Sequence, residues 1–303
     1  MGEPRIARLY LYDDLRRRVE AGRRGFLTTV TALLRGEGWE VYLRPDTPEE
    51  LAQARTRSGY SLVRMIAPSN PRGLTFRRTY FAPFWHIERS AERWDWPVAR
   101  AAFDPSTVPP HKAQRFLATL RHRHFSDHAA PTREGFVLVP LQGRLLERRS
   151  FQACTPIQML ETLLQHDPKR HIHATLHPKE PYNPQDIAAL DRLAALPRFS
   201  YGKGESERLL PACDYVATMN SSVALHGYVL EKPALLFGRI DFHHIAASVF
   251  DLGLGEAMSR APVMRPDFAA YLWWFFRDKA IDDSRPDAPA RIAAALRAGG
   301  WPI

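Results

Sequence analysis

Apolar positions in the second half of the chain fall into short continuous runs, separated by stretches with helical spacing. Residues 136–141 (FVLVPL) form such a run, typical of a strand buried on both faces of a parallel sheet. Further strands are predicted at 172–176, 215–219 and 234–237, with helices beginning near Thr155-Pro156, Asn183-Pro184 and Ser222. Strands alternating with helices over this many units predict a doubly wound parallel sheet.

The first half contains one strand–helix–strand unit, after which the apolar positions show no regular spacing. A strand is predicted at 6–12, a loop at 22–25, a helix at 26–34 and a second strand at 40–43. Residues 68–110 are rich in proline and aromatic residues and give no assignment, whereas 111–124 predict a helix. Residues 126–134 are polar and contain proline, so we place the domain boundary there. The expected domains are 1–130 and 131–303, both α/β.

Composition narrows the class of protein. The chain has 303 residues, 45% of them hydrophobic, enough for one large core or two ordinary ones. No run of about 18 apolar residues occurs, which is the length that a membrane-spanning helix needs. The first residues are polar, and only two cysteines occur, Cys154 and Cys213. A cytoplasmic protein without disulfide bonds is expected.

The net charge of +9 predicts affinity for anions but does not indicate whether the anion is a nucleic acid, a lipid or a phosphorylated or carboxylated substrate. Arginines occur in short clusters, at Arg16-Arg17-Arg18, Arg77-Arg78 and Arg148-Arg149, which we interpret as solvated basic surface. No nucleic-acid-binding motif accompanies the charge, so no nucleic-acid partner is expected. An anionic bilayer would suit the charge equally well, which leaves peripheral contact with the inner membrane open.

Polar side chains follow two of the predicted strands at the point where each ends. His177-Pro178-Lys179 comes directly after 172–176, and Asn220-Ser221-Ser222 directly after 215–219. Ligands of parallel sheets bind beyond the carboxyl ends of the strands. A helix start at Ser222 would present free backbone N–H groups to a phosphate, although a Ser-Ser pair is more often an ordinary helix cap.

Three histidines, His171, His173 and His177, share parity in and beside the strand predicted at 172–176. No carboxylate or cysteine joins them at the spacing of metal ligands, so no metal is expected there.

Four segments between 135 and 245 resemble the C-terminal domain of the capsule-polysaccharide transferases that use CMP-Kdo. The resemblance is carried by VPLQ at 139–142, LHPK at 176–179, YVATMNSSVALHG at 215–227 and KPALLFG at 232–238. Bacterial CMP-sialic acid transferases are similar more distantly. The resemblance implies the GT-B fold, in which two Rossmann-like domains with parallel sheets face a cleft. It also implies that 1–130 is the acceptor-side domain and that 131–303 is the domain that binds the nucleotide-sugar.

The resemblance also implies roles for individual residues. His177, Pro178 and Lys179 would hold the CMP moiety, and Asn220, Ser221 and Ser222 would surround its phosphate. Gln142 matches the start of the family's glutamine motif, but Leu146 stands where that motif has an acidic residue.

The N-terminal third resembles the family less. The 22–25 segment resembles a glycine-containing loop that faces the cleft, and a catalytic carboxylate is expected in this domain. No acidic-glycine motif is found. The candidates are Glu88 with His86, and Asp95, although ordinary surface carboxylates explain them at least as well.

The function expected from these observations is transfer of an acidic sugar, with Kdo the best single choice, from a CMP-activated donor. A surface glycan or lipid-linked molecule would accept it, without a metal or cofactor. The alternative is a non-catalytic glycan-assembly or regulatory protein that retains the nucleotide pocket, which the missing acidic motif and Leu146 favour.

Overall fold

The structure is a computed structural model that describes residues 4–127 and 130–303, and the chain divides into two compact units. The first unit comprises the residues up to Arg100 together with Phe275–Ile303, and the second comprises Ala101–Trp274. The predicted boundary at 126–134 therefore falls inside the second unit. The described residues of that segment, 126–127 and 130–134, form neither helix nor strand and come after α5 (Pro110–Phe125) and before β6 (Phe136–Leu141). Helix α5 packs against other helices of the same unit.

The second unit contains a six-stranded sheet in the order β11-β10-β9-β6-β7-β8, and every neighbouring pair is parallel. Its strands are β6, β7 (His171–Leu176), β8 (Phe199–Lys203), β9 (Tyr215–Thr218), β10 (Ala234–Leu236) and β11 (Ala247–Ser248). From β6 the chain moves outward through β7 to β8, and then returns to β9 on the other side of β6. The direction of winding thus reverses between β6 and β9.

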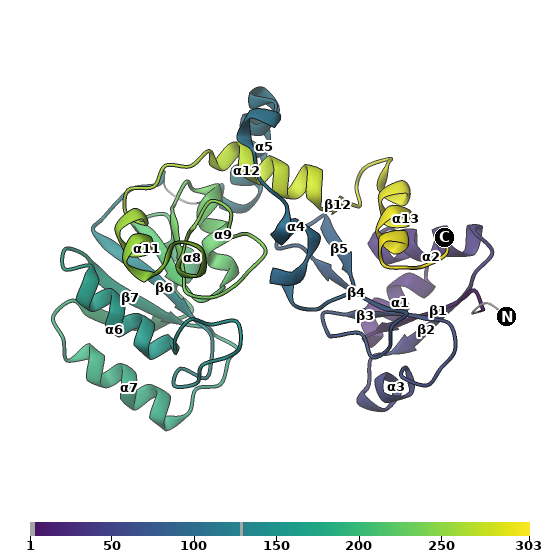
Figure 1. Cartoon of the computed structure of the whole chain (residues 1–303), viewed down its shortest axis with the longest axis horizontal. Coiled ribbons are helices and arrows are strands. Elements are labelled where there is room, and N and C mark those ends of the chain that lie inside the picture. Colours follow the sequence, from purple (N-terminus) through teal and green to yellow (C-terminus); the bar gives the residue numbers. More distant parts are fainter. Residues whose placement is uncertain (1–3, 128–129) are drawn as a thin grey trace. The chain divides into compact units, whose positions relative to one another are not determined.

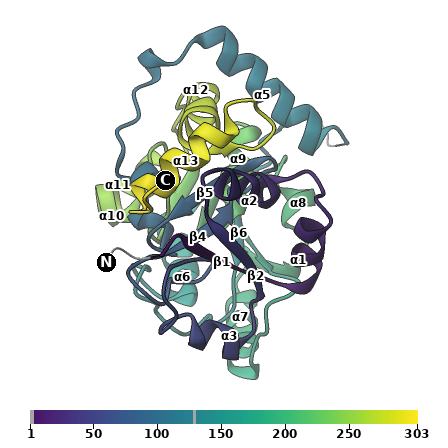
Figure 2. The same cartoon turned by 90° about the vertical axis from the view of Figure 1, so that its right-hand side faces the viewer.

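Helices begin in this unit where capping residues were predicted. Thr155 and Gln158 form a reciprocal capping box at α6 (Pro156–His166), and Asn183 caps α7 (Pro184–Ala194) together with Asp186. Ser221 caps α9 (Ser222–Val229). The remaining helices of the unit are α8 (Ser206–Leu209), α10 (Val249–Leu252), α11 (Leu254–Arg260) and α12 (Phe268–Trp273), with a 3-10 turn at Pro105–Thr107. Helices α5 and α12 lie side by side (Figure 1 and Figure 2).

The first unit contains a second six-stranded sheet, in the order β12-β5-β4-β3-β1-β2. Its strands are β1 (Ile6–Leu11), β2 (Glu40–Pro45), β3 (Tyr60–Arg64), β4 (Gly73–Arg78), β5 (Phe84–Glu88) and β12 (Ile281–Asp282). Four neighbouring strands, β2, β1, β3 and β4, are parallel. Strand β5 is antiparallel to β4, and β12 is antiparallel to β5. Two Rossmann-like units with mainly parallel sheets confirm the predicted α/β fold class.

Helices cover both faces of the first sheet. They are α1 (Asp13–Glu20), α2 (Phe26–Gly36), α3 (Pro48–Gln53), α4 (Pro97–Arg100) and α13 (Ala288–Ala298), with a 3-10 turn at Arg93–Asp95. Figure 1 shows α2 and α13 on one face and α3 on the other. A π-helical segment, Trp274–Lys279, leads back into this unit, where β12 pairs with β5 and α13 packs against α2. Residues 275–303, expected in the C-terminal domain, thus complete the first sheet.

Each unit has its own apolar core on its sheet. In the first, the Phe26 ring stacks on Trp85 at 4.6 Å, and Trp39 stacks on Trp301 at 5.4 Å between ring centroids. In the second, the two-sided burial of β6 and β9 matches their continuous apolar sequences. Within 4–127 and 130–303, no helix combines the length and the apolar character that crossing a membrane requires.

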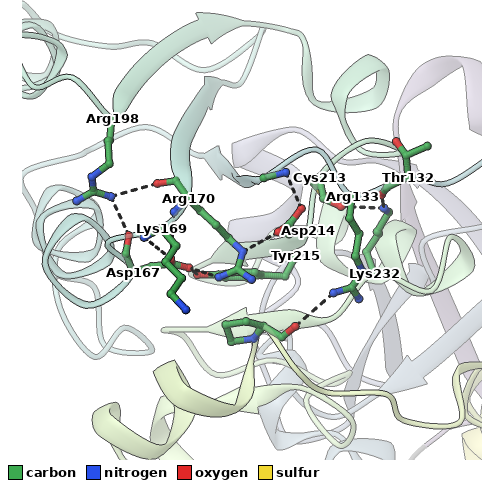
Figure 3. A network of polar contacts seen from close by, with 12 residues as sticks. Thr132, Arg133, Asp167, Lys169, Arg170, Arg198, Cys213, Asp214, Tyr215 and Lys232 are labelled. Carbon is green, nitrogen blue, oxygen red and sulfur yellow. Dashed lines mark hydrogen bonds and ion pairs between the residues drawn. The ribbon is translucent and has the colours of Figure 1, made fainter.

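A polar network closes the amino-terminal edge of the second sheet (Figure 3). Arg170 lies between two carboxylates: its Nε donates to Asp214 Oδ2 at 2.7 Å and its Nη1 to Asp167 Oδ2 at 3.0 Å. The buried Tyr215 hydroxyl also donates to Asp167, at 3.0 Å. Asp214 Oδ1 in turn accepts the Gly135 backbone N–H at 2.9 Å. These contacts join the segments that enter β6, β7 and β9.

Candidate nucleotide site

The reversal of winding in the second sheet brings three sequence-predicted segments to one edge. Gln142 follows β6, His177 follows β7 and Asn220 follows β9, and β6 lies between the other two strands. Adjacent connections that leave a parallel sheet in opposite directions open a crevice beyond the carboxyl ends, where ligands of such folds bind. The carboxyl ends of β6 and β9 therefore mark the best-placed candidate site of this unit.

Thr218 and Ser221 shape the end of β9. Thr218 Oγ1 donates to the Pro140 carbonyl of β6 at 3.1 Å and lies 3.4 Å from the backbone N of Ser221, which donates to it. The Ser221 hydroxyl accepts the Val223 N–H at 3.3 Å, so this serine does cap α9. Its hydroxyl proton remains available to a ligand, because capping uses the oxygen as acceptor. Ser222 is half-buried at the first turn of the same helix.

The ends of β6 and β7 are joined by Tyr182. Its hydroxyl accepts the His177 backbone N–H at 2.8 Å and donates to the Leu141 carbonyl at 3.3 Å. Burial raises the pKa of this phenol, which therefore stays protonated. The Lys179 N–H donates to His177 Nδ1 at 3.2 Å, so a neutral His177 carries its proton on Nε2. The exposed imidazole can then donate a hydrogen bond outward.

The loop after β6 is held firmly beside these strand ends. The buried Asp186 carboxylate accepts the Leu145 N–H at 3.0 Å and so fixes the loop to the start of α7.

Gly238, after β10, packs so closely that a Cβ there would lie 2.8 Å from the Met219 carbonyl oxygen and 3.2 Å from the Phe151 ring. The Arg149 guanidinium lies over that same ring, 4.9 Å from its centroid. The half-buried Arg149 guanidinium therefore contacts the Phe151 ring, which packs beside Gly238 near the end of β9.

Three residues of this site were not singled out by the sequence: Thr218, Tyr182 and Arg149. Arg149 belongs to a cluster interpreted as solvated surface, yet burial lowers the pKa of its guanidinium. A usable signal did exist for Thr218, a polar residue in an otherwise apolar strand. Leu146, at the departure from the glutamine motif, is 46% exposed.

The acid–base candidates of the first unit lie on β5 and in the turn that follows it. Glu88 pairs with Thr75 of β4, and His86 pairs with Arg77 near the carboxyl end of that strand. His86 Nδ1 and Glu88 Oε1 are 3.1 Å apart, and both side chains are largely buried. Asp95 lies in the 3-10 turn, 3.6 Å from Arg100 Nη2 on an exposed surface. The structure thus places Glu88 beside His86, and the His86 ring packs against Trp96, the sequence neighbour of Asp95, with 4.9 Å between ring centroids.

The histidines of β7 bind a serine. His171 Nε2 and His173 Nδ1 lie 2.6 and 2.8 Å from Ser200 Oγ on the neighbouring edge strand. His177 lies beyond the strand end and does not join them. In the described part of the chain, no three histidine, cysteine or acidic side chains are grouped so as to hold a metal ion.

We expect His177→Ala to weaken nucleotide binding roughly fivefold and to leave the cooperative thermal transition in place, because it removes one exposed hydrogen-bond donor. Calorimetric titration and thermal melting measure the two effects. His166→Ala is the matched control, since His166 is an exposed histidine at the far end of α6. If His177→Ala loses its cooperative melting while its folded fraction binds normally, the role of His177 is structural.

Comparison with known proteins gives a likeness in fold. No family model matches the sequence, and no curated protein matches it. Among solved structures, Thermosulfurimonas dismutans KpsC, described as a beta Kdo 2,7 transferase, is similar with a TM-score of 0.52 and 13% identity. The alignment covers 96% of this chain and 99% of that one. The chain therefore shares its two-unit fold with that protein along nearly the whole length.

A second solved structure, the wall teichoic acid polymerase TagF, aligns with a TM-score of 0.28 and 12% identity, over 62% of this chain and 49% of that one. A score at this level does not establish a common fold.

Proposed function

We propose that the chain is a glycosyltransferase that takes an acidic sugar, Kdo foremost, from a CMP-activated donor. The observation that carries the proposal is the meeting of Ser221-Ser222, His177-Pro178-Lys179 and Gln142 at one edge, where the sheet reverses its winding. The fold shared with a Kdo transferase supports it. The acceptor is a surface glycan or a lipid-linked molecule, and the net charge of +9 supports peripheral contact with the anionic inner membrane.

The donor phosphate lies, in this proposal, at the N-terminus of α9. The free N–H groups of the first turn and the positive end of the helix dipole favour an anion there. The hydroxyls of Ser221 and Ser222 add donors, and Arg149 and Lys179 add positive charge. These groups stabilise the departing CMP without a metal ion.

The reaction is a direct displacement at the anomeric carbon. A bond forms between that carbon and the acceptor oxygen, and the bond to the CMP phosphate oxygen breaks. The acceptor proton passes to a base of the first unit, for which Glu88 with His86, and Asp95, are the candidates. Glu88→Gln and Asp95→Asn, assayed for transfer with CMP binding as the control, decide between them.

The test of the proposal is the nucleotide. We expect CMP to bind at least about tenfold more tightly than UDP, GDP or ADP when each is titrated calorimetrically into the full chain. Transfer from CMP-Kdo should survive treatment with EDTA. A tenfold preference for UDP or GDP would remove the CMP assignment, and CMP binding without any transfer would indicate a non-catalytic protein.

A further inference from the structure

The first unit holds a cavity of about 460 Å³ that the nucleotide site does not use. It lies at the carboxyl edge of the parallel strands, where Tyr12 follows β1, Arg64 ends β3 and Arg78 ends β4. The winding of this sheet also reverses, between β1 and β3, and the Arg64 guanidinium lies 4.9 Å from the centre of the Tyr12 ring across that point. The cavity therefore occupies the position where α/β sheets bind ligands.

Arginines dominate its polar lining. Five contribute: Arg18, Arg23, Arg24, Arg64 and Arg78. They come from α1, the loop before α2, β3 and β4, and we call this space the arginine cavity. A spread over four segments means that the fold, and not one basic stretch of sequence, gathers the charges.

The cavity has one carboxylate, Asp283, which is already engaged. It accepts a hydrogen bond from Trp85 Nε1 at 3.2 Å, and burial raises the pKa of its carboxyl group. By contrast, in residues 4–127 and 130–303 the guanidinium groups of Arg18, Arg23 and Arg78 form neither ion pair nor hydrogen bond. Gathered like charges without counter-charges repel one another, and an anionic ligand removes that repulsion.

Most of the remaining lining is apolar or aromatic and includes Tyr12, Phe26, Met65 and Trp85. Aromatic faces beside guanidinium groups suit a sugar ring that carries a charged substituent better than a bare ion. The volume falls within the range of small-molecule sites.

We propose that the arginine cavity binds a sugar or glycan through an oxyanion, a phosphate or a carboxylate group. The anion site rests on the cavity alone and stands whether or not the proposed function is correct. Arginine forms paired hydrogen bonds to both kinds of oxyanion. The loop at 22–25 supplies Arg23 and Arg24 to the cavity just before α2 begins.

The experiment titrates the full chain calorimetrically, at low ionic strength, with inorganic phosphate and separately with gluconate, a sugar acid. Saturable binding of either supports the proposal, and the preferred one identifies the group. Arg18→Gln with Arg78→Gln should weaken that binding at least about tenfold. The control, Arg17→Gln with Arg35→Gln, removes the same charge from exposed positions of α1 and α2 outside the cavity and should change it less than about twofold.

Three results would overturn the proposal: no saturable binding of either anion, equal weakening in both double variants, or loss of CMP binding in the Arg18/Arg78 variant, which would make the cavity the nucleotide site. Should the wild-type chain bind phosphate but not CMP, the proposed nucleotide site fails while the anion site stands.

Discussion

Replacing Ser221 by glycine and Ser222 by alanine is expected to weaken binding of a CMP-sugar by about 3 kcal/mol, with little change in stability. Charge-assisted hydrogen bonds contribute about 1.5–3 kcal/mol each, and the double substitution removes up to two. Ser221 caps α9 through the Val223 N–H, but glycine is a tolerable cap and costs only a few tenths of a kcal/mol. Calorimetry with CMP and denaturation in urea separate the two quantities.

The control removes the N-cap side chain of another helix in the same unit. Asp267 caps α12 in the same unit by accepting the Ala270 N–H at 2.8 Å, and α12 does not follow a strand of the sheet. Asp267→Gly should lower stability modestly and leave CMP affinity unchanged. If the double serine variant keeps full CMP affinity and full transfer activity, the serines only cap the helix and the phosphate site lies elsewhere.

Arg170→Leu is expected to destabilise the protein by about 3 kcal/mol, because it leaves two buried carboxylates without the cation they share. Asp167 and Asp214 are 5% and 7% exposed, and both bind Arg170 directly. The midpoint of urea denaturation should fall accordingly. CMP affinity of the folded variant should not change, because the network lies at the amino-terminal edge of the sheet and the nucleotide site at the opposite edge.

Two further variants serve as controls for the stability loss of Arg170→Leu. Arg192→Leu removes an exposed arginine from α7 and should change stability by no more than about 0.5 kcal/mol. Arg170→Lys retains the charge but not the fork of donors, so it should recover part of the loss. A stable Arg170→Leu protein would mean that the carboxylates are satisfied by Tyr215 and backbone N–H groups alone.

The second sheet was predictable because its central strands are buried on both faces and its helices begin at strong caps. Strand β8 escaped prediction because it is an edge strand, with Ser200, Gly202 and Lys203 among its residues. Helix α1 escaped because only Val19 of its eight residues is buried, so no apolar stripe marks it. Strand β5 lies within the unassigned 68–110 stretch, and its outer partner, β12, lies far away in sequence.

Some features of the candidate site could be predicted from the sequence and others could not. Residues at strand ends, such as His177 and Asn220, could be predicted because carboxyl ends of parallel strands share an edge. The contacts that shape that edge could not, since Thr218 reaches Pro140 across 78 positions of sequence and Tyr182 reaches Leu141 across 41. The arginine cavity combines four separate segments, none of which is distinctive alone.

The return of residues 275–303 to the first sheet makes that unit discontinuous, with the second unit inserted into it. A ribosome releases the whole of Ala101–Trp274 before β12 and α13 emerge. Until then β5 is an uncovered edge strand and α2 lacks the helix that packs on it. The insert can therefore finish folding before its host, which reverses the usual N-terminal-first order of synthesis-coupled folding.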